Sequence, residues 1–253
     1  MRMKLLAVVT LVVAVALLQA GRAWSASRAT DVPNGFFTFY GGFASAGNTN
    51  LKMIGQDHSV NRPYQWDVNN LSMKNSGWGG MGVGYWFKQM PISIGGSFTM
   101  DFFSTAIKAQ SNTATWAWTD TGQTGSKNIL IAERKMFQFV PGFNLIAGVP
   151  LKFVRPYAGI GPAIFMVRHD ISLTNQAGAV TQTASAFDAK VGFNAFVGLE
   201  GFISRNFSVF GEAKYSEVHN LDFQPWPVSD PAYHNKYDKL TANHIAIGGA
   251  FHF

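Results

Sequence analysis

The chain has 253 residues, of which 47% are hydrophobic and only 13% are charged, with a formal net charge of +6. The charged share is about half that of an ordinary soluble protein, which argues against a conventional water-facing surface. Three of the positive charges, Arg2, Lys4 and Arg22, lie in the first 22 residues, so the remaining charge is too small to indicate a nucleic-acid partner. There is no cysteine, which excludes disulfides and thiolate metal sites.

The N-terminus has the pattern of a secretory signal peptide. Two basic residues precede the apolar run of residues 5–18, and small residues follow it. The run is too short for a typical membrane-spanning helix and no stop-transfer pattern follows. We therefore expect a cleaved signal peptide over residues 1–23 and one mature domain over residues 24–253. Cleavage after Ala20 or Ala26, or a retained anchor helix, are the alternatives.

Eight segments of the mature chain alternate apolar with small or polar side chains, and this period of two predicts β-strands. They are residues 36–44, 79–87, 92–103, 135–147, 154–167, 187–202, 207–218 and 242–253. Short links (88–91, 148–153 and 204–206) alternate with long polar links (45–77, 104–134, 168–186 and 217–241). An even number of strands joined by alternating short turns and long loops is typical of an up-and-down outer-membrane barrel, with short turns in the periplasm.

The charged residues indicate which face of each strand points inward. In residues 187–202 and 207–218, charged side chains share the parity of glycines, while the other parity is apolar. A soluble barrel would carry a water-facing surface rich in Lys and Glu, whereas a sparse polar face suits the narrow interior of an eight-stranded barrel. Unpaired charges there would be costly, so we expect a polar network in the lumen. Its predicted members are Arg155, Asp188, Lys190, Asn194, Glu200, Glu212 and Lys214, with Asp101 as a further candidate.

Aromatic residues near the predicted strand ends suggest the girdles that flank the apolar band of such barrels. The candidates are Trp78, Tyr85, Trp86, Phe137 and Tyr215. The fold class expected from all these patterns is all-β: an eight-stranded antiparallel up-and-down transmembrane β-barrel.

The C-terminal sequence HIAIGGAFHF (residues 244–253) and the segments RPYAGIG (155–161) and FGEAKY (210–215) resemble strands of the OmpA/OmpX-type outer-membrane barrels, including the opacity-like members. The resemblance covers about residues 35–253. It implies a Gram-negative outer membrane, with lipid and lipopolysaccharide around the barrel. It also implies periplasmic chaperones and the barrel assembly machinery as partners, with Phe251 and Phe253 as the C-terminal assembly signal.

Three functions remain open at this point. The first is a barrel with a packed lumen that presents four surface loops for a structural or interaction role and is not an enzyme. The second is a narrow porin or a channel for small apolar solutes, similar to OmpW. The third is a lipid A hydrolase, which Ser216, Glu217 and His219 suggest by resemblance, although Ser216 and His219 have opposite parity.

No cofactor or metal site is expected from the sequence, and it does not identify a surface ligand. Exposed aromatic residues tend to anchor interfaces. Trp116, Trp118 and the segment 225–227 (Pro-Trp-Pro) are therefore candidates for partner contacts, with loop packing as the alternative.

Overall fold

The computed structural model describes residues 32–57, 60–88, 92–174, 180–224 and 233–253. The predicted signal peptide and the segment 225–227 lie outside these residues. Within the described part, no helix is long and apolar enough to cross a membrane. The strands are β1 (Gly35–Ala46), β2 (Thr49–Asp57), β3 (Arg62–Leu71), β4 (Met73–Lys74), β5 (Ser76–Lys88), β6 (Ser93–Ile107), β7 (Gln110–Trp118), β8 (Thr124–Ile131), β9 (Arg134–Gly148), β10 (Val154–Thr174), β11 (Val180–Phe202), β12 (Phe207–Phe223) and β13 (His234–His252).

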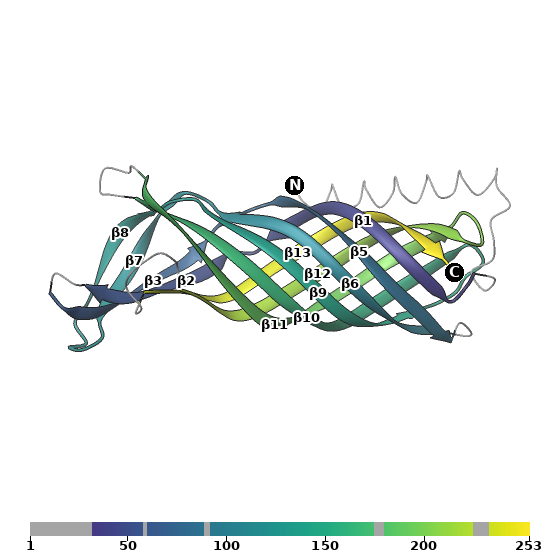
Figure 1. The fold of residues 1–253 in the computed structure, drawn as a ribbon, viewed down its shortest axis with the longest axis horizontal. Helices are drawn as coiled ribbons and strands as arrows, with labels where there is room; N and C mark the ends of the chain where they lie inside the picture. The colour runs from purple at the N-terminus through teal and green to yellow at the C-terminus, as the bar shows by residue number, and fades with distance from the viewer. Residues whose placement is uncertain (1–31, 58–59, 89–91, 175–179, 225–232) are drawn as a thin grey trace.

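Eight of these strands close into a ring (Figure 1). The order is β1, β5, β6, β9, β10, β11, β12 and β13, and every neighbouring pair is antiparallel. The ring closes between β13 and β1, whose ladder runs from the pair Phe36 and His252 to the pair Ala46 and Ala242. Closure leaves no free sheet edge in this ring, which is a requirement for a β-structure that crosses a membrane. The predicted eight-stranded antiparallel barrel is confirmed.

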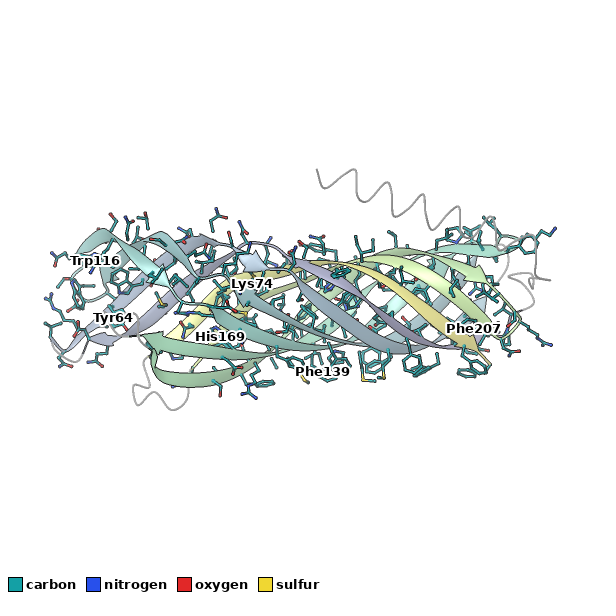
Figure 2. The ribbon with its side chains drawn as sticks, turned by 90° about the horizontal axis from the view of Figure 1, so that it is seen from above. Tyr64, Lys74, Trp116, Phe139, His169 and Phe207 are labelled. Carbon is teal, nitrogen blue, oxygen red and sulfur yellow. The ribbon has the colours of Figure 1, made fainter. Side chains whose placement is uncertain are left out.

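The outer surface of the ring carries a band of large apolar side chains (Figure 2). Phe43 is 77% exposed, Val191 is 72% exposed and Ile247 is 62% exposed. An apolar surface of this extent is not stable in water, and it fits the acyl chains of a bilayer. The predicted lipid-facing parity is therefore confirmed on the strands that carry it.

Two of the predicted girdle residues face the other way. Trp78 and Trp86 are buried inside the ring, whereas Tyr85 and Phe137 are exposed on its outer surface. The prediction was wrong for Trp78 and Trp86 because strand parity, rather than nearness to a strand end, decides which face a side chain occupies.

The predicted loops 45–77 and 104–134 are largely strand, which corrects the sequence analysis. β2 pairs with the outer part of β13, and the sheet continues through β3 and β7 to β8 beyond one end of the ring (Figure 1). We call these four strands the extension sheet. Their many Asn, Thr, Ser and Lys residues concealed the alternation, and each hairpin pairs with a strand beside it.

We call the half of the barrel next to the extension sheet the outer half, and the half next to the turn between β11 and β12 the inner half. The interior of the outer half is an apolar core. β10 to β13 continue past the predicted strand ends, so the predicted loops 168–186 and 217–241 are also partly strand. The core side chains are less than about 2% exposed and come from both the ring and the extension sheet; they include Leu51, Val68, Leu71, Ile107, Met136, Val218, Leu221, Phe223 and Tyr237. Apart from its outward apolar band, this half is therefore organised like a soluble protein.

Candidate functional site

The inner end of the lumen is sealed by a buried arginine. The Arg155 side chain is fully buried and its guanidinium lies over two rings, 4.5 Å from the Trp86 centroid and 5.0 Å from the Phe202 centroid. Its Nη1 is 3.7 Å from Oε2 of Glu200. Stacking and ion pairing together offset the desolvation of a cation in this position.

Glu200 links this arginine to β12 and β13. Oε1 of Glu200 accepts a 2.6 Å hydrogen bond from the Ser208 hydroxyl and lies 3.0 Å from Nε2 of His252. Ser208 Oγ and His252 Nε2 are themselves 2.8 Å apart. Because all of these side chains are buried, the cluster locks three strands together beside the turn that joins β11 to β12.

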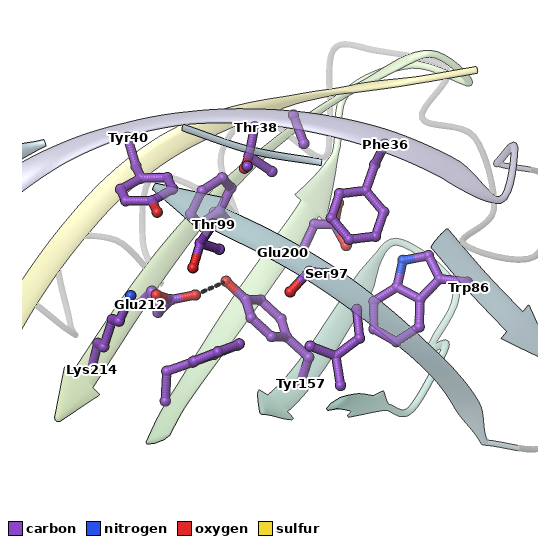
Figure 3. A pocket seen from close by; sticks show the side chains of 15 residues that line it. Phe36, Thr38, Tyr40, Trp86, Ser97, Thr99, Tyr157, Glu200, Glu212 and Lys214 are labelled. Carbon is purple, nitrogen blue, oxygen red and sulfur yellow. Dashed lines mark hydrogen bonds between the residues drawn. The ribbon is translucent and has the colours of Figure 1, made fainter. Parts of the chain in front are cut away.

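A second ionic cluster lies deeper in the lumen (Figure 3). Lys214 forms a buried ion pair with Asp101, and the Tyr40 hydroxyl donates a 2.8 Å hydrogen bond to the other oxygen of Asp101. Next to it, the Tyr157 hydroxyl donates a 3.0 Å hydrogen bond to Oε2 of Glu212. Each charge therefore has a specific partner, as buried charges require.

Little space remains between the two clusters. The cavity that Tyr40, Tyr157, Glu200, Glu212 and Lys214 line has a volume of about 60 Å³. That space accommodates a few water molecules and no larger solute. Toward the outside, the lumen is closed by the apolar core described above. The lumen is thus filled along its length by two ionic clusters and one apolar plug.

Asn194 lies on the same inward face of β11 and is fully buried. Neither atom of its amide has a hydrogen-bond partner among the described protein residues. A Cβ at Gly142 would come within 3.0 Å of Nδ2 of Asn194, so the glycine on β9 makes room for this amide. Asn194 thus lies in the lumen without joining either ionic cluster.

Asp188 and Lys190 lie apart from the two clusters, in the outer half. The ladder between β11 and β12 ends at the pair Gly192 and Val218. Beyond this point Oδ2 of Asp188 accepts a 2.7 Å hydrogen bond from the backbone N–H of Asp222, in place of a ladder partner. Lys190 lies 4.0 Å from the same oxygen and its side chain is 42% exposed. The alternation in the sequence predicted the inward parity of Asp188 and Lys190. It did not predict at which residue β11 and β12 separate.

The predicted hydrolase residues are not assembled into a catalytic arrangement. Ser216 is buried inside the ring, whereas His219 is exposed on the outside, with its Nε2 2.6 Å from Oε1 of Glu217. A nucleophile and its base must be within hydrogen-bonding distance, and here the wall of the barrel separates them.

Several lumen residues were not singled out from the sequence. Tyr40, Tyr157, Ser208 and His252 supply the hydrogen bonds described above, and all four have inward parity. Parity was therefore the signal that could have found them. Which hydroxyl meets which carboxylate depends on strand stagger, which a single sequence does not specify.

The end of the barrel next to the extension sheet carries a further polar cluster and a buried histidine. Asp222 lies 2.8 Å from His234 and 3.1 Å from Lys236. Partial burial acts to raise the pKa of Asp222, but the hydrogen bonds from His234 and Lys236 outweigh it and lower the pKa. His169, which contacts Tyr237 in the apolar core, has a pKa well below 6.5 because it is buried and lies near the Arg134 charge.

The extension sheet forms a hollow lined with aromatic side chains. Trp66 on β3 is paired with Trp116 on β7, and Tyr64 with Trp118, so that all four lie on one face. The hollow has a volume of about 730 Å³ and is completed by Met53, Gln56, Asp57, Lys127, Ile129 and Tyr233. Figure 2 shows Tyr64 and Trp116 at the end of the molecule opposite Phe207.

No protein-family model matches the sequence, and no curated protein sequence matches it. Solved structures that resemble the chain include the outer membrane protein OprG from Pseudomonas aeruginosa (13% identity, TM-score 0.45, covering 88% of this chain and 98% of that one). Neisserial surface protein A is similar at 11% identity, with a TM-score of 0.43 and coverage of 87% and 97%. The outer membrane protease OmpT from Escherichia coli is similar at 9% identity, with a TM-score of 0.47 and coverage of 87% and 97%.

The names of these neighbours describe differing roles, so the comparisons assign no specific role to this chain. The ring of eight strands, its closure and its outward apolar band rest on the structure itself. The protein is an eight-stranded antiparallel up-and-down β-barrel with an apolar outer surface, which is the architecture of outer-membrane-type barrels.

Proposed function

We propose that this protein is a closed outer-membrane barrel whose extension sheet serves as an extracellular binding surface. The observation that carries the proposal is the filled lumen. The Arg155 and Glu200 cluster, the Lys214 and Asp101 pair and the apolar core leave a cavity of only about 60 Å³. The extracellular end, by contrast, is enlarged by four additional strands that do not contribute to the ring.

The proposal includes the route to the membrane. Residues 1–23 direct export and are removed, and the periplasmic chaperones and the barrel assembly machinery receive the chain. Phe251 and Phe253 act as the assembly signal. They lie exposed at the end of β13, where the backbone of Phe253 hydrogen-bonds to Gly35 at the closure of the ring. Lipid and lipopolysaccharide then surround the apolar band.

Single-channel recording in a planar bilayer tests the closed lumen. The refolded mature protein is added to the bilayer, and a general porin in the same bilayer serves as the positive control. We expect no stable conductance steps from this protein. Steps of reproducible size at neutral pH would contradict the proposal, provided that heat-modifiable migration in detergent gels shows the sample to be folded.

A second candidate is a channel for small apolar solutes. The observation that favours it is the apolar character of the outer plug, where Leu221, Phe223 and Tyr237 are fully buried. A path opened there would be lined by apolar side chains. Uptake of naphthalene into liposomes that contain the protein separates the two candidates, because a closed barrel gives the same rate as protein-free liposomes.

A further inference from the structure

The hollow of the extension sheet has aromatic rings that pack against glycines of neighbouring strands. A Cβ at Gly125 on β8 would come within 2.6 to 2.8 Å of three atoms of the Trp116 indole. The indole therefore lies directly against Gly125, where a larger residue would displace it. Gly55 on β2 has the same relation to Tyr64, whose hydroxyl and Cζ would be 2.7 and 2.8 Å from a Cβ there.

Both rings also line the hollow. Trp66 is the cross-strand neighbour of Trp116, and the rings of Trp116 and Trp118 meet edge to face at 6.2 Å between centroids. The rings therefore hold one another in place. Rigid rings lose little conformational entropy when a ligand binds, which favours their use as contact platforms.

Polar groups stand beside these rings. Gln56 and Asp57 come from the end of β2, and Lys127 comes from β8. Among the described residues that line the hollow there are one carboxylate and one ammonium, whose charges cancel. These residues therefore offer no net electrostatic attraction to a quaternary ammonium ligand or to a polyanion.

The hollow also differs from a site for an apolar molecule. Pockets for apolar ligands enclose most of the surface of the ligand, whereas this hollow is partly open. Tyr64 and Trp116, which line it, lie at the end of the molecule (Figure 2). A ligand that matches an open site with flat apolar platforms and a neutral polar border has apolar C–H faces and many hydroxyl groups. Pyranose rings have this chemistry, and a volume of about 730 Å³ fits one to three of them.

We propose that the hollow between β2, β3, β7 and β8 binds a neutral carbohydrate, with Trp116 and Tyr64 as stacking platforms and Asp57 and Lys127 as hydrogen-bonding partners of its hydroxyls. The inference rests on the proposed role of the extension sheet as an extracellular binding surface. It adds the chemical class of the ligand and the residues that contact it.

The test uses the full mature protein refolded in lauryldimethylamine oxide or in nanodiscs, because detergents with sugar headgroups would compete for the site. Binding to a printed array of neutral oligosaccharides is followed by calorimetric titration with lactose, maltotriose and diacetylchitobiose. Sialyllactose and a heparin disaccharide are the anionic counterparts, choline is the cationic one and naphthalene is the apolar one. We expect at least one neutral saccharide to bind, and the counterparts to bind more weakly or not at all.

Four variants locate the site. Trp116→Ala removes one platform and is expected to weaken binding by about tenfold or more, as truncation of an anchoring aromatic does. Trp116→Phe retains a ring and should retain part of the affinity. Gly125→Ala keeps every aromatic side chain but displaces the indole from the sheet, and it should weaken binding less than Trp116→Ala. Leu130→Ala is the matched control, because Leu130 is exposed on β8 with parity opposite to Lys127 and Ile129.

The outcomes are distinct. The proposal is overturned if no neutral saccharide binds, if only a charged or apolar counterpart binds, or if Trp116→Ala binds as tightly as Leu130→Ala. Each variant is accepted only if it shows heat-modifiable migration, which guards against misfolding. Conductance of the same preparation is measured separately, so failure of sugar binding in a non-conducting barrel would reject the carbohydrate site and leave the closed-barrel proposal standing.

Discussion

The inner and outer halves of this barrel are built with opposite polarity. In the inner half, apolar side chains such as Ile247 face outward, and Arg155, Glu200, Lys214 and Asp101 are sealed inside. In the outer half, the interior is mainly apolar, and the buried Arg134 at the start of β9 donates a hydrogen bond to the amide oxygen of Asn235. The interior changes from polar to apolar along continuous strands. The environment on each side of the strand, rather than the backbone, therefore decides which face is apolar.

In strand β12 the inward face changes from polar to apolar within 17 residues. Its inward residues begin with Ser208 and Lys214 and end with Leu221 and Phe223. Asn220 has a φ of 56°, a left-handed conformation that Asn tolerates, and it shifts the parity so that the last apolar residues face inward. A strand that ended at the membrane surface would not need such a shift of parity.

The largest expected effect breaks the polarity of the inner half. Lys214→Met leaves Asp101 buried without its cation, and removal of one partner of a buried ion pair costs about 3–5 kcal/mol. The free energy of unfolding in urea and lipid vesicles measures this loss. The double variant Asp101→Asn with Lys214→Met should recover most of the stability. If the single and double variants lost the same free energy of unfolding, the Lys214–Asp101 ion pair would not be what stabilises the inner half.

The corresponding change in the outer half removes an apolar side chain. Phe223→Ala creates a cavity in the core, and Phe to Ala changes typically cost about 3–5 kcal/mol. We expect the loss to be confined to the outer half, where it appears as faster amide exchange in β2, β12 and β13. The membrane-embedded parts of β5 and β6 should be unaffected. Uniformly faster exchange would indicate that the halves do not unfold separately.

A matched pair of surface substitutions compares the two environments directly. Val191 and Leu130 are both 72% exposed, but Val191 lies in the lipid-facing band and Leu130 on the extension sheet. Val191→Arg should destabilise the protein in vesicles, because a charge in the lipid-facing band loses hydration, with an upper limit of about 2–4 kcal/mol, the cost at the bilayer midplane. Leu130→Arg should change the stability by less than about 0.5 kcal/mol. Similar effects at both positions would place the band outside the membrane.

The smallest effect is a pH dependence limited to the outer half. Burial lowers the pKa of His169 below 6.5, so the folded protein holds it neutral while the unfolded chain takes up a proton below about pH 6.5. Stability is therefore fully present above that pH and falls as the pH decreases, by at most about 1.4 kcal/mol per pH unit. Amide exchange in β12 and β13, corrected for intrinsic rates, measures the effect. It should disappear in His169→Gln, and persistence there would assign it to another group.

The sequence predicted the inner half more completely than the outer half, for a physical reason. Where a strand separates lipid from lumen, alternation is strict, and the outward residues Phe137, Phe193 and Ile247 were placed correctly. The same parity predicted the lumen candidates. Parity does not specify which residues they contact, nor that the ladder between β11 and β12 ends before Asp188.

The extension sheet could not be derived in this way. In residues 45–77 and 104–134 both faces contain polar residues, because along much of β3, β7 and β8 side chains of both parities are at least partly exposed. The pairing of Trp66 with Trp116 joins segments about 50 residues apart, and no local pattern contains that information. Gly55 and Gly125 lie in segments predicted as loops, whereas the structure shows that they make room for rings on neighbouring strands.

The most direct test of the reversed polarity is spin-label accessibility along β13. The chain has no cysteine, so single cysteines can be labelled cleanly at Asp238, Ile245, Ile247 and Phe251 in vesicles. We predict that labels at 245, 247 and 251 collide with dissolved oxygen and are protected from a water-soluble nickel complex, and that the label at 238 shows the reverse. Access of the nickel complex to position 247 in the folded protein would contradict the account.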